Sequence, residues 1–194
     1  MTSEGSHSAD GITGIVLCGG EGRRVAGADK PLLNYRGRPL IEWVLDAIQP
    51  QVDRLLISTN RNDENYATYA PVMSDELPAY SGPLAGIVTC LKCCTTELAF
   101  ICPGDVPHLP TAIVAKMLHA YREFGEEVAV AHDGVQRQNL HLLLARNMTD
   151  SLLSYLAEGH RSVHGWLDGL NLVEVDFSNE TSSFRNLNDP DDFR

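Results

Sequence analysis

An apolar run followed at once by a glycine-rich, basic loop constrains this chain more than any other feature. Ile12 to Leu17 is typical of a buried strand, and the loop after it opens with Gly19 and Gly20. Glycine lets backbone N–H groups approach an anion closely, and Arg24 and Lys30 add full positive charge. A strand, a glycine turn and two cations in this order predict a loop that holds phosphate groups.

The spacing within this loop excludes two common nucleotide-binding motifs. Gly22 and Gly27 have the glycine spacing of a Walker A motif, but Lys30 comes two residues too late and no Ser or Thr follows it. A dinucleotide fingerprint needs a third glycine and an acidic ribose ligand, and Val25 and Asn60 stand in those places. The remaining alternative is a plain strand-to-helix turn, which the two cations disfavour.

The charge of the chain is uneven, and this limits its partners. A net charge of -11 argues against nonspecific binding to nucleic acid or to an anionic membrane. Between Glu21 and Arg38, however, five basic residues outnumber two acidic ones. Such a positive island attracts a small anion, so we expect a small-molecule substrate, no nucleic acid and no membrane partner.

The N-terminus and the cysteines favour one domain in a reducing compartment. Residues 1–11 are rich in Ser and Gly, so we expect a mobile tail there and a single domain over residues 12–194. The first ten residues hold no Lys or Arg and no apolar core of a signal peptide. The five cysteines are an odd number, which favours free thiols over disulfides. We therefore expect a cytoplasmic protein.

Apolar runs and helical patterns alternate along the chain. We expect strands at residues 12–17, 54–59, 98–102, 128–132, 141–145 and 172–176. We expect helices at residues 40–48, 84–94, 111–124 and 149–158. The alternation is strict only in the first half. This order predicts a three-layer α/β fold with a mostly parallel central sheet.

Two acidic residues follow predicted elements near the phosphate loop. Asp105 comes just after the apolar strand at residues 98–102, at the sheet edge where open α/β folds bind ligands. It can place Mg²⁺ against a bound triphosphate, or it can simply cap the next helix. Asp75 alone suggests a solvated loop acid, but Gly82 and Gly86 follow and would let a base or ribose approach the backbone.

Cysteines and histidines elsewhere give weaker indications. Cys90, Cys93 and Cys94 are spaced to share one face of the predicted helix. A zinc site needs about four ligands and no second pair is suitably spaced, so we expect these thiols to pack against the sheet. Most of the remaining histidines are expected to be structural or solvated: His108, His132, His141, His160 and His164.

Taken together, the motifs resemble those of the molybdenum cofactor guanylyltransferases. The matching segments are Leu-x-Gly-Gly-x-x-x-Arg from Leu17, Asp-Lys at 29–30, Gly-Pro-Leu-Ala-Gly at 82–86 and Pro-x-Asp-x-Pro at 103–107. A weaker likeness covers residues 155–166 and 186–190. The resemblance implies a Rossmann-like nucleotidyltransferase fold. The implied enzyme joins GMP from GTP to the terminal phosphate of molybdopterin and releases pyrophosphate, with Mg²⁺ as cofactor.

The resemblance also implies roles for individual residues. The implied nucleotide-binding residues are Leu17, Gly19, Gly20, Lys30, Asn60, Asp75, Gly82, Gly86 and Asp105. The implied catalytic residues are Arg24 and Lys30 on the phosphates and Asp105 on the metal. Asn60 and Asp75 would lie around the guanosine. The second substrate would lie near residues 137–141, with Arg161 and His164 as candidates to hold its phosphate.

Four positions depart from the usual pattern of this family. Cys18 replaces a common alanine, Val25 a methionine, Gly104 a cysteine and His108 an aromatic residue, and none of these changes removes a charged ligand. Residues 137–141 also lack the usual proline. Two alternatives remain open: a cytidylyltransferase acting on molybdopterin or another small acceptor, and a non-catalytic nucleotide-binding regulatory domain. The resemblance further implies transient contact with enzymes that make or accept the molybdenum cofactor.

Overall fold

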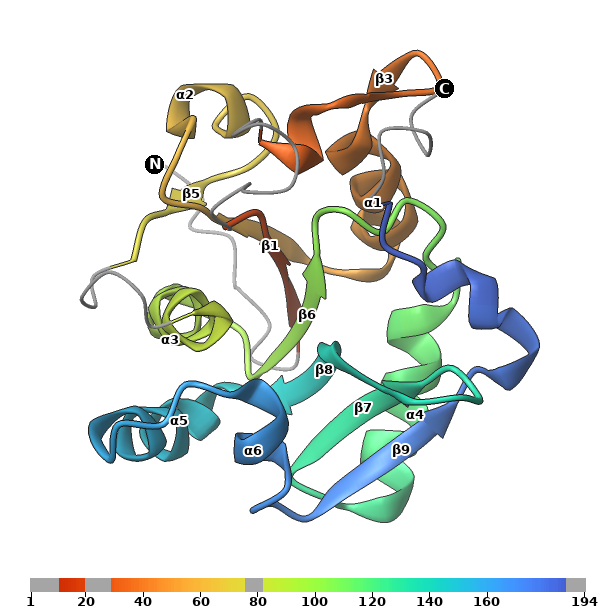
Figure 1. The fold of residues 1–194 in the computed structure, drawn as a ribbon. Coiled ribbons are helices and arrows are strands. Elements are labelled where there is room, and N and C mark those ends of the chain that lie inside the picture. The colour runs from red at the N-terminus through yellow and green to blue at the C-terminus, as the bar shows by residue number, and fades with distance from the viewer. Residues whose placement is uncertain (1–10, 20–28, 76–81, 188–194) are drawn as a thin grey trace, which may run out of the picture.

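A computed structural model describes residues 11–19, 29–75 and 82–187, and its centre is a seven-stranded sheet of order β5-β4-β1-β6-β8-β7-β9 (Figure 1). The strands are β1 (Ile12–Leu17), β4 (Arg54–Ser58), β5 (Val72–Met73), β6 (Leu98–Pro103), β7 (Val128–His132), β8 (Arg137–Ala145) and β9 (Leu172–Asp176). β8 pairs antiparallel with β6 and β7, whereas the other neighbours in this sheet pair parallel. The prediction of a mostly parallel sheet is confirmed.

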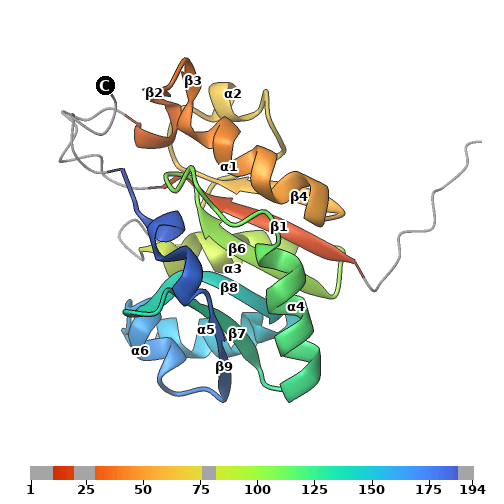
Figure 2. The same cartoon turned by 90° about the vertical axis from the view of Figure 1, so that its right-hand side faces the viewer.

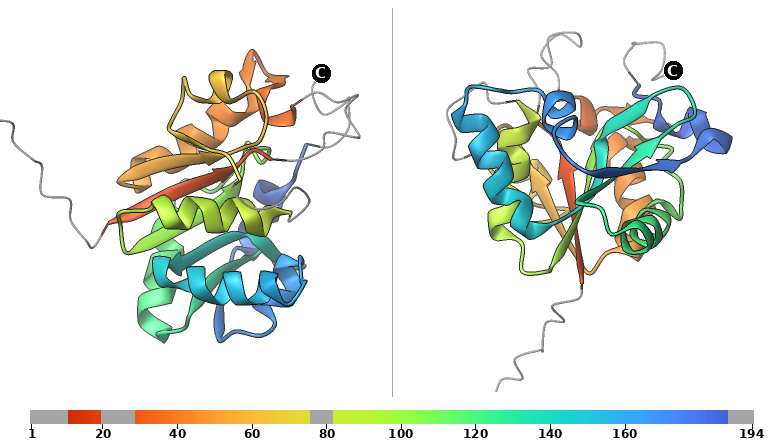
Figure 3. Two further views of the ribbon diagram at one scale, coloured as in Figure 1. Left: turned by 90° about the vertical axis from the view of Figure 1, so that its left-hand side faces the viewer. Right: turned by 90° about the horizontal axis from the view of Figure 1, so that it is seen from below.

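Helices cover both faces of the sheet. One face carries α1 (Leu40–Ile48) and α4 (Ile113–Phe124), which Figure 2 shows side by side. The other carries α3 (Pro83–Cys93), α5 (Thr149–Ala157) and α6 (Val163–Leu167), seen in Figure 3. Each helix layer shares a separate apolar core with its own face of the sheet. The three-layer prediction is therefore confirmed.

Buried positions explain why these segments form the elements they do. β1 is buried almost throughout because helices cover the sheet on both sides. In α1 the buried residues recur at helical spacing: Leu40, Ile41, Val44, Leu45 and Ile48. α4 ends where Gly125 takes a φ of 68° and donates its N–H to Tyr121 O, a conformation that favours glycine.

Short elements were missed because they have too few residues to show a period. They include α2 (Asp63–Tyr66), the 3₁₀ turns η2 (Lys30–Leu32), η3 (Gln49–Gln51), η4 (Arg146–Met148) and η5 (Ser178–Phe184), and a hairpin of β2 (Asn34–Tyr35) and β3 (Arg38–Pro39). Arg36 and Gly37 both have positive φ in the hairpin turn, as a two-residue hairpin loop requires. Tyr35 of this hairpin packs with Leu40 and with Leu187 near the C-terminus.

The boundaries correct several predictions. β4 ends at Ser58, α4 begins at Ile113, and β8 begins at Arg137 rather than at residue 141. Gly11, expected in the tail, is buried and its carbonyl accepts from Leu98 N. Residues 1–10 and 188–190, which carry the rest of the tail and of the terminal motif, lie outside the described residues.

The prediction that three cysteines share one helix face is wrong. α3 ends at Cys93, which is exposed, and Cys94 is already extended at φ -65° and ψ 135°. Cys94 is nevertheless buried, in the same apolar core as Cys90, and burial raises the pKa of its thiol to about 11. All five cysteines are free thiols, as predicted.

No described helix combines the length and the apolar character needed to cross a bilayer.

Candidate active site

The candidate site lies at the carboxyl edge of β1, β4, β5 and β6. Backbone hydrogen bonds continue between the segments that leave these strands. Cys18 N donates to Ser58 O over 2.8 Å, Gly104 N to Leu17 O over 2.9 Å, and Thr59 N to Met73 O over 3.1 Å. These hydrogen bonds hold together the segments that carry the predicted site residues, at the edge of the sheet where the strands end.

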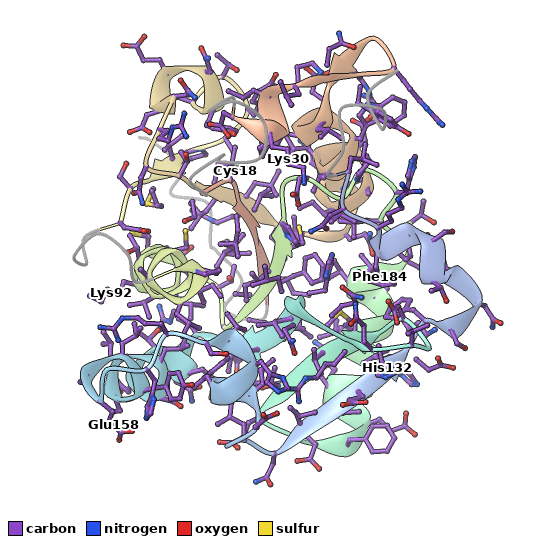
Figure 4. All side chains as sticks on the ribbon, in the orientation of Figure 1. Cys18, Lys30, Lys92, His132, Glu158 and Phe184 are labelled. Carbon is purple, nitrogen blue, oxygen red and sulfur yellow. The ribbon has the colours of Figure 1, made fainter. Side chains whose placement is uncertain are left out.

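Lys30 and Asp105 meet at this edge although 75 residues separate them. The Lys30 Nζ lies 2.7 Å from Asp105 Oδ2, and their side chains are 15% and 20% exposed. A charge pair that is mostly shielded from water interacts more strongly than one on the open surface. The arrangement brings the two residues together; their predicted roles on the phosphates and on a metal stay predictions. Figure 4 labels Lys30 beside Cys18 in this region.

Asp105 fits a magnesium ligand by its chemistry. Within the described ranges, no group of three or more His, Cys, Asp or Glu side chains could hold a metal by itself. Mg²⁺ is commonly bound through one or two carboxylates together with substrate phosphates and water, rather than by a protein cage. A single partly buried carboxylate beside a lysine matches that mode.

Asn60 and Asp75 form a second pair at the ends of β4 and β5. Asn60 Nδ2 donates to Asp75 Oδ2, and Asp75 N donates to Asn60 Oδ1, both over 2.8 Å. This leaves Asp75 Oδ1 buried, with no hydrogen-bond partner in the part of the chain that the structure describes. A buried carboxylate oxygen without a donor is costly, and a ligand N–H or O–H would satisfy it.

The glycines of the site have different surroundings. Gly82 precedes α3 with a φ of 66°, which favours glycine there, and Pro83 occupies the first turn. Gly86 lies inside α3, where an added Cβ would fall 2.2 Å from Ser58 Oγ and 3.4 Å from Asp75 Oδ1. Its small size thus lets α3 pack against β4 and Asp75. Gly19 is exposed, and an added Cβ would meet no described atom within 4 Å.

Two supporting contacts escaped the sequence analysis. Asn62 Nδ2 donates to Asp29 Oδ2 over 2.9 Å, and Asn62 has a φ of 55° that suits an asparagine before a helix. In the sequence, only the Asn-Asp pair at 62–63 could have indicated that the chain turns into a helix at Asn62. Tyr35 Oη and His108 Nε2 lie 3.0 Å apart and tie the hairpin to the Asp105 turn, a contact across 73 residues without any local pattern.

Part of the predicted phosphate loop lies outside the described residues. This applies to Gly20, Gly22, Arg24, Val25 and Gly27. The role of Arg24 on the phosphates and of Gly20 on the nucleotide therefore stays a prediction.

The region predicted for the second substrate contains a compact charge network. Arg137 Nη2 lies 2.7 Å from both His164 Nδ1 and Asp168 Oδ1, and Arg137 Nε donates to Asn139 Oδ1 over 2.7 Å. The hydrogen bond from Arg137, with the nearby His164, holds the pKa of Asp168 below its usual value. Arg161 Nη1 donates to the backbone carbonyls of Leu156 and His160. Of the two residues predicted to hold the phosphate of the second substrate, His164 thus contacts Arg137, and Arg161 Nη1 is bonded to backbone carbonyls.

His141 on β8 is a buried histidine. It is 2% exposed, its ring packs edge-on against Phe184 at 5.1 Å between ring centroids, and neither ring nitrogen has a hydrogen-bond partner among the described residues. Burial lowers the pKa of His141 to about 3, so the ring is neutral at pH 7. It lies in the core with Phe184, away from the Arg137 network.

Comparison with known proteins places the chain among nucleotide-transferring proteins. A family model described as a MobA-like NTP transferase domain matches residues 14–172. A molybdenum cofactor guanylyltransferase of Shewanella amazonensis is 38% identical over 93% of this chain and 92% of its own length. One of the same name from Mannheimia succiniciproducens is 38% identical over 91% of this chain and 94% of its own.

A solved structure agrees with the fold. The molybdopterin-guanine dinucleotide biosynthesis protein A of Archaeoglobus fulgidus superposes with a TM-score of 0.76, at 24% identity, over 93% of this chain and 94% of its own. The shared architecture extends over the strands that carry the candidate site and over the C-terminal half.

Proposed function

This chain belongs to the family of MobA-like NTP transferases, and from that premise we propose that it transfers GMP from GTP to the terminal phosphate of molybdopterin, releasing pyrophosphate. It is a nucleotidyltransferase by its relatives. The observation that carries the proposed reaction is the Lys30–Asp105 pair at 2.7 Å, beside the loop after β1. It offers positive charge for a triphosphate and a carboxylate for Mg²⁺ at one place.

The proposed reaction needs positioning and charge stabilisation more than covalent catalysis. An oxygen of the molybdopterin phosphate attacks the α-phosphorus of GTP, and the bond from that phosphorus to the bridging oxygen of the leaving pyrophosphate breaks. The attacking phosphate is already ionised at pH 7, so no general base is required. Lys30 then stabilises negative charge on the phosphates as the bond breaks, together with Arg24 as predicted from the sequence.

Asp105 holds the metal in this proposal. Mg²⁺ bound there supplies neutralisation of the phosphate oxygens and alignment of the triphosphate. Asp105 would hold the metal and Lys30 would contact the phosphates, so each of the two charges would face a group of opposite charge.

Asp75 supports the placement of the nucleoside at β4 and β5. Its Oδ1 is a buried acceptor without a donor among the described residues, and Asn60 fixes the other oxygen. Guanine carries N–H donors on one edge, and ribose carries hydroxyl donors, so either group satisfies this oxygen. The choice of guanine rests on the names of the relatives.

We further propose that the protein works in the cytoplasm, in contact with enzymes that make or accept the cofactor.

A pyrophosphate assay tests the proposal. The protein is incubated with Mg²⁺, molybdopterin and either GTP, CTP or ATP, and pyrophosphate release is measured with and without the acceptor. We expect release with GTP that depends on both molybdopterin and Mg²⁺. Release with CTP in preference to GTP would favour the cytidylyltransferase alternative. GTP binding without release, in the presence of authentic acceptor, would favour the regulatory domain.

A further inference from the structure

Cys18 and Gly104 meet where two loops of the candidate site leave the sheet. Cys18 follows β1 directly, and Gly104 lies between β6 and Asp105. The Gly104 N–H donates to Leu17 O over 2.9 Å, so the turn that carries Asp105 is held against the start of the phosphate loop. The spacing between these loops decides where the Asp105 carboxylate lies relative to a nucleotide bound by the loop.

Gly104 has no room for a side chain. An added Cβ would lie 2.7 Å from Cys18 Sγ and 3.3 Å from the Cβ and Cγ of Pro31. The backbone does not demand glycine, because the φ of Gly104 is not positive. The sulfur of Cys18 is therefore the nearest obstacle to a side chain at this position.

The same contact reaches the Lys30–Asp105 pair. Pro31 is buried and follows Lys30, and Gly104 precedes Asp105. Cys18, Pro31 and Gly104 thus pack together directly beside the two charged residues. A change in volume at any of the three shifts the backbone that positions Lys30 or Asp105.

The thiol of Cys18 is suited to packing rather than to chemistry. Its side chain is 4% exposed. Burial, with a further contribution from Asp29, raises the pKa of the Cys18 thiol well above its ordinary value. The reactive thiolate is therefore disfavoured, and the sulfur acts as a small apolar group.

We propose that Cys18 is a positioning residue for the transfer reaction: its sulfur fills the space that Gly104 leaves empty and so fixes the separation between the phosphate loop and the Asp105 turn. The kinetic part of this proposal rests on the proposed function. The packing part stands on the contact between Cys18 and Gly104 alone.

The test changes the side-chain volume at positions 18 and 104, singly and together. Gly104→Ala adds a methyl group against the sulfur, Cys18→Ala removes the sulfur, and the double variant restores nearly the original volume. We expect Gly104→Ala to lower kcat about tenfold, and to raise the Mg²⁺ concentration for half-maximal rate about threefold, because small displacements of catalytic groups are costly. The double variant should return to within about threefold of wild type, since the two changes compensate each other.

Gly169→Ala is the matched control. There, too, φ is not positive, and among the described atoms an added Cβ meets only Trp166 O, at an ordinary 3.5 Å. It should keep the wild-type kcat and Mg²⁺ requirement. A normal kcat and Mg²⁺ requirement in Gly104→Ala, or a double variant as impaired as Gly104→Ala, would overturn the proposal.

Thermal unfolding tests the packing of Cys18 against Gly104 independently of the transfer reaction. The midpoints of wild type, both single variants and the double variant should be non-additive, and additive midpoints would overturn the contact. A wild-type chain that transfers no GMP would contradict the proposed function alone. The dissociation constant for Mg²⁺·GTP then replaces the rate, and an unchanged constant in Gly104→Ala would overturn the positioning role.

Discussion

The two halves of the sheet use their polar residues in different ways. At the carboxyl edge of β1, β4, β5 and β6, polar groups form small pairs that leave capacity for a ligand: Lys30 with Asp105, and Asn60 with an Asp75 whose second oxygen has no described donor. At the start of β8, Arg137 is bonded to Asn139, His164 and Asp168. The first region thus holds a buried acceptor without a described donor, whereas the Arg137 guanidinium is bonded to side chains of the chain itself. We predict that nucleotide binding depends on the first region and stability on the Arg137 contacts, and the second substrate near residues 137–141 stays a prediction.

A substitution at Asp105 should have the largest effect, because it removes the proposed metal ligand and the partner of Lys30. We expect Asp105→Asn to lower the Mg²⁺-dependent rate of pyrophosphate release at least about 100-fold. Exposed Asp150, in the first turn of α5, provides the control Asp150→Asn, which should keep the wild-type rate. Normal Mg²⁺-dependent turnover in Asp105→Asn would contradict the proposal that Asp105 is a metal ligand.

Removing Asp75 should weaken nucleotide binding more than catalysis. Asp75→Ala deletes the buried acceptor, and a hydrogen bond to a charged group contributes about 1.5 to 3 kcal/mol. We therefore expect GTP to bind about 10- to 100-fold more weakly, as measured by titration calorimetry. Because Asn60 and Asp75 bond to each other, Asn60→Ala combined with Asp75→Ala should cost less than the sum of the two single changes. Unchanged GTP affinity in Asp75→Ala would place the nucleoside elsewhere.

His141, buried on β8 against Phe184, makes the core sensitive to acid. The ordinary histidine pKa is 6.5 and the folded value is about 3, so between these values the unfolded chain binds a proton and the folded chain does not. The stability that depends on a neutral His141 is present above pH 6.5 and is lost as the pH falls toward 3. From pH 7 to pH 5 this single group should lower the free energy of unfolding by about 2 kcal/mol.

His141→Leu removes this group at similar volume and provides the comparison. Urea unfolding at pH 7 and pH 5 should show a smaller loss of stability for His141→Leu than for wild type, by about 2 kcal/mol. Equal losses in the two proteins would mean that His141 can be protonated in the folded state.

A substitution at Arg137 should have the smallest effect and should act on stability. Arg137→Ala breaks the bonds to His164 and Asp168, and we expect the unfolding midpoint to fall by about 2 to 4 °C. The Michaelis constant for GTP should stay at the wild-type value, in contrast to Asp75→Ala. Exposed Arg122 on α4 provides the control Arg122→Ala, with no change in either quantity. A weaker affinity for GTP in Arg137→Ala would contradict the division between the two regions.

The sequence predicted the binding region better than the second region for a physical reason. Strands buried on both faces are continuous apolar runs, so the ends of β1 and β6, and Asp105 just after β6, could be placed from the chain alone. β8 was predicted from residue 141, because its first residues are polar and only half-buried. The bulge beside Val130 and Ala131 also interrupts its pairing with β7.

Contacts between distant residues could not be predicted from local patterns. Tyr35 meets His108, and Cys18 meets Gly104, only because the fold brings their loops together. Cys18, Gly104 and His108 stand out in the sequence as departures from a family pattern, but no local pattern indicates that Cys18 and Gly104 touch. Cys94 was misplaced because the end of α3 depends on how the chain turns into β6, which helical spacing does not show.

The transfer of isotopic label tests the central claim most directly. The protein is incubated with Mg²⁺ and molybdopterin, and with GTP labelled at either the α- or the γ-phosphorus, and the products are separated. The account predicts that the α-label appears in the molybdopterin product and the γ-label in pyrophosphate. Transfer of the γ-label to the acceptor, or no transfer of the α-label in the presence of active acceptor, would contradict it.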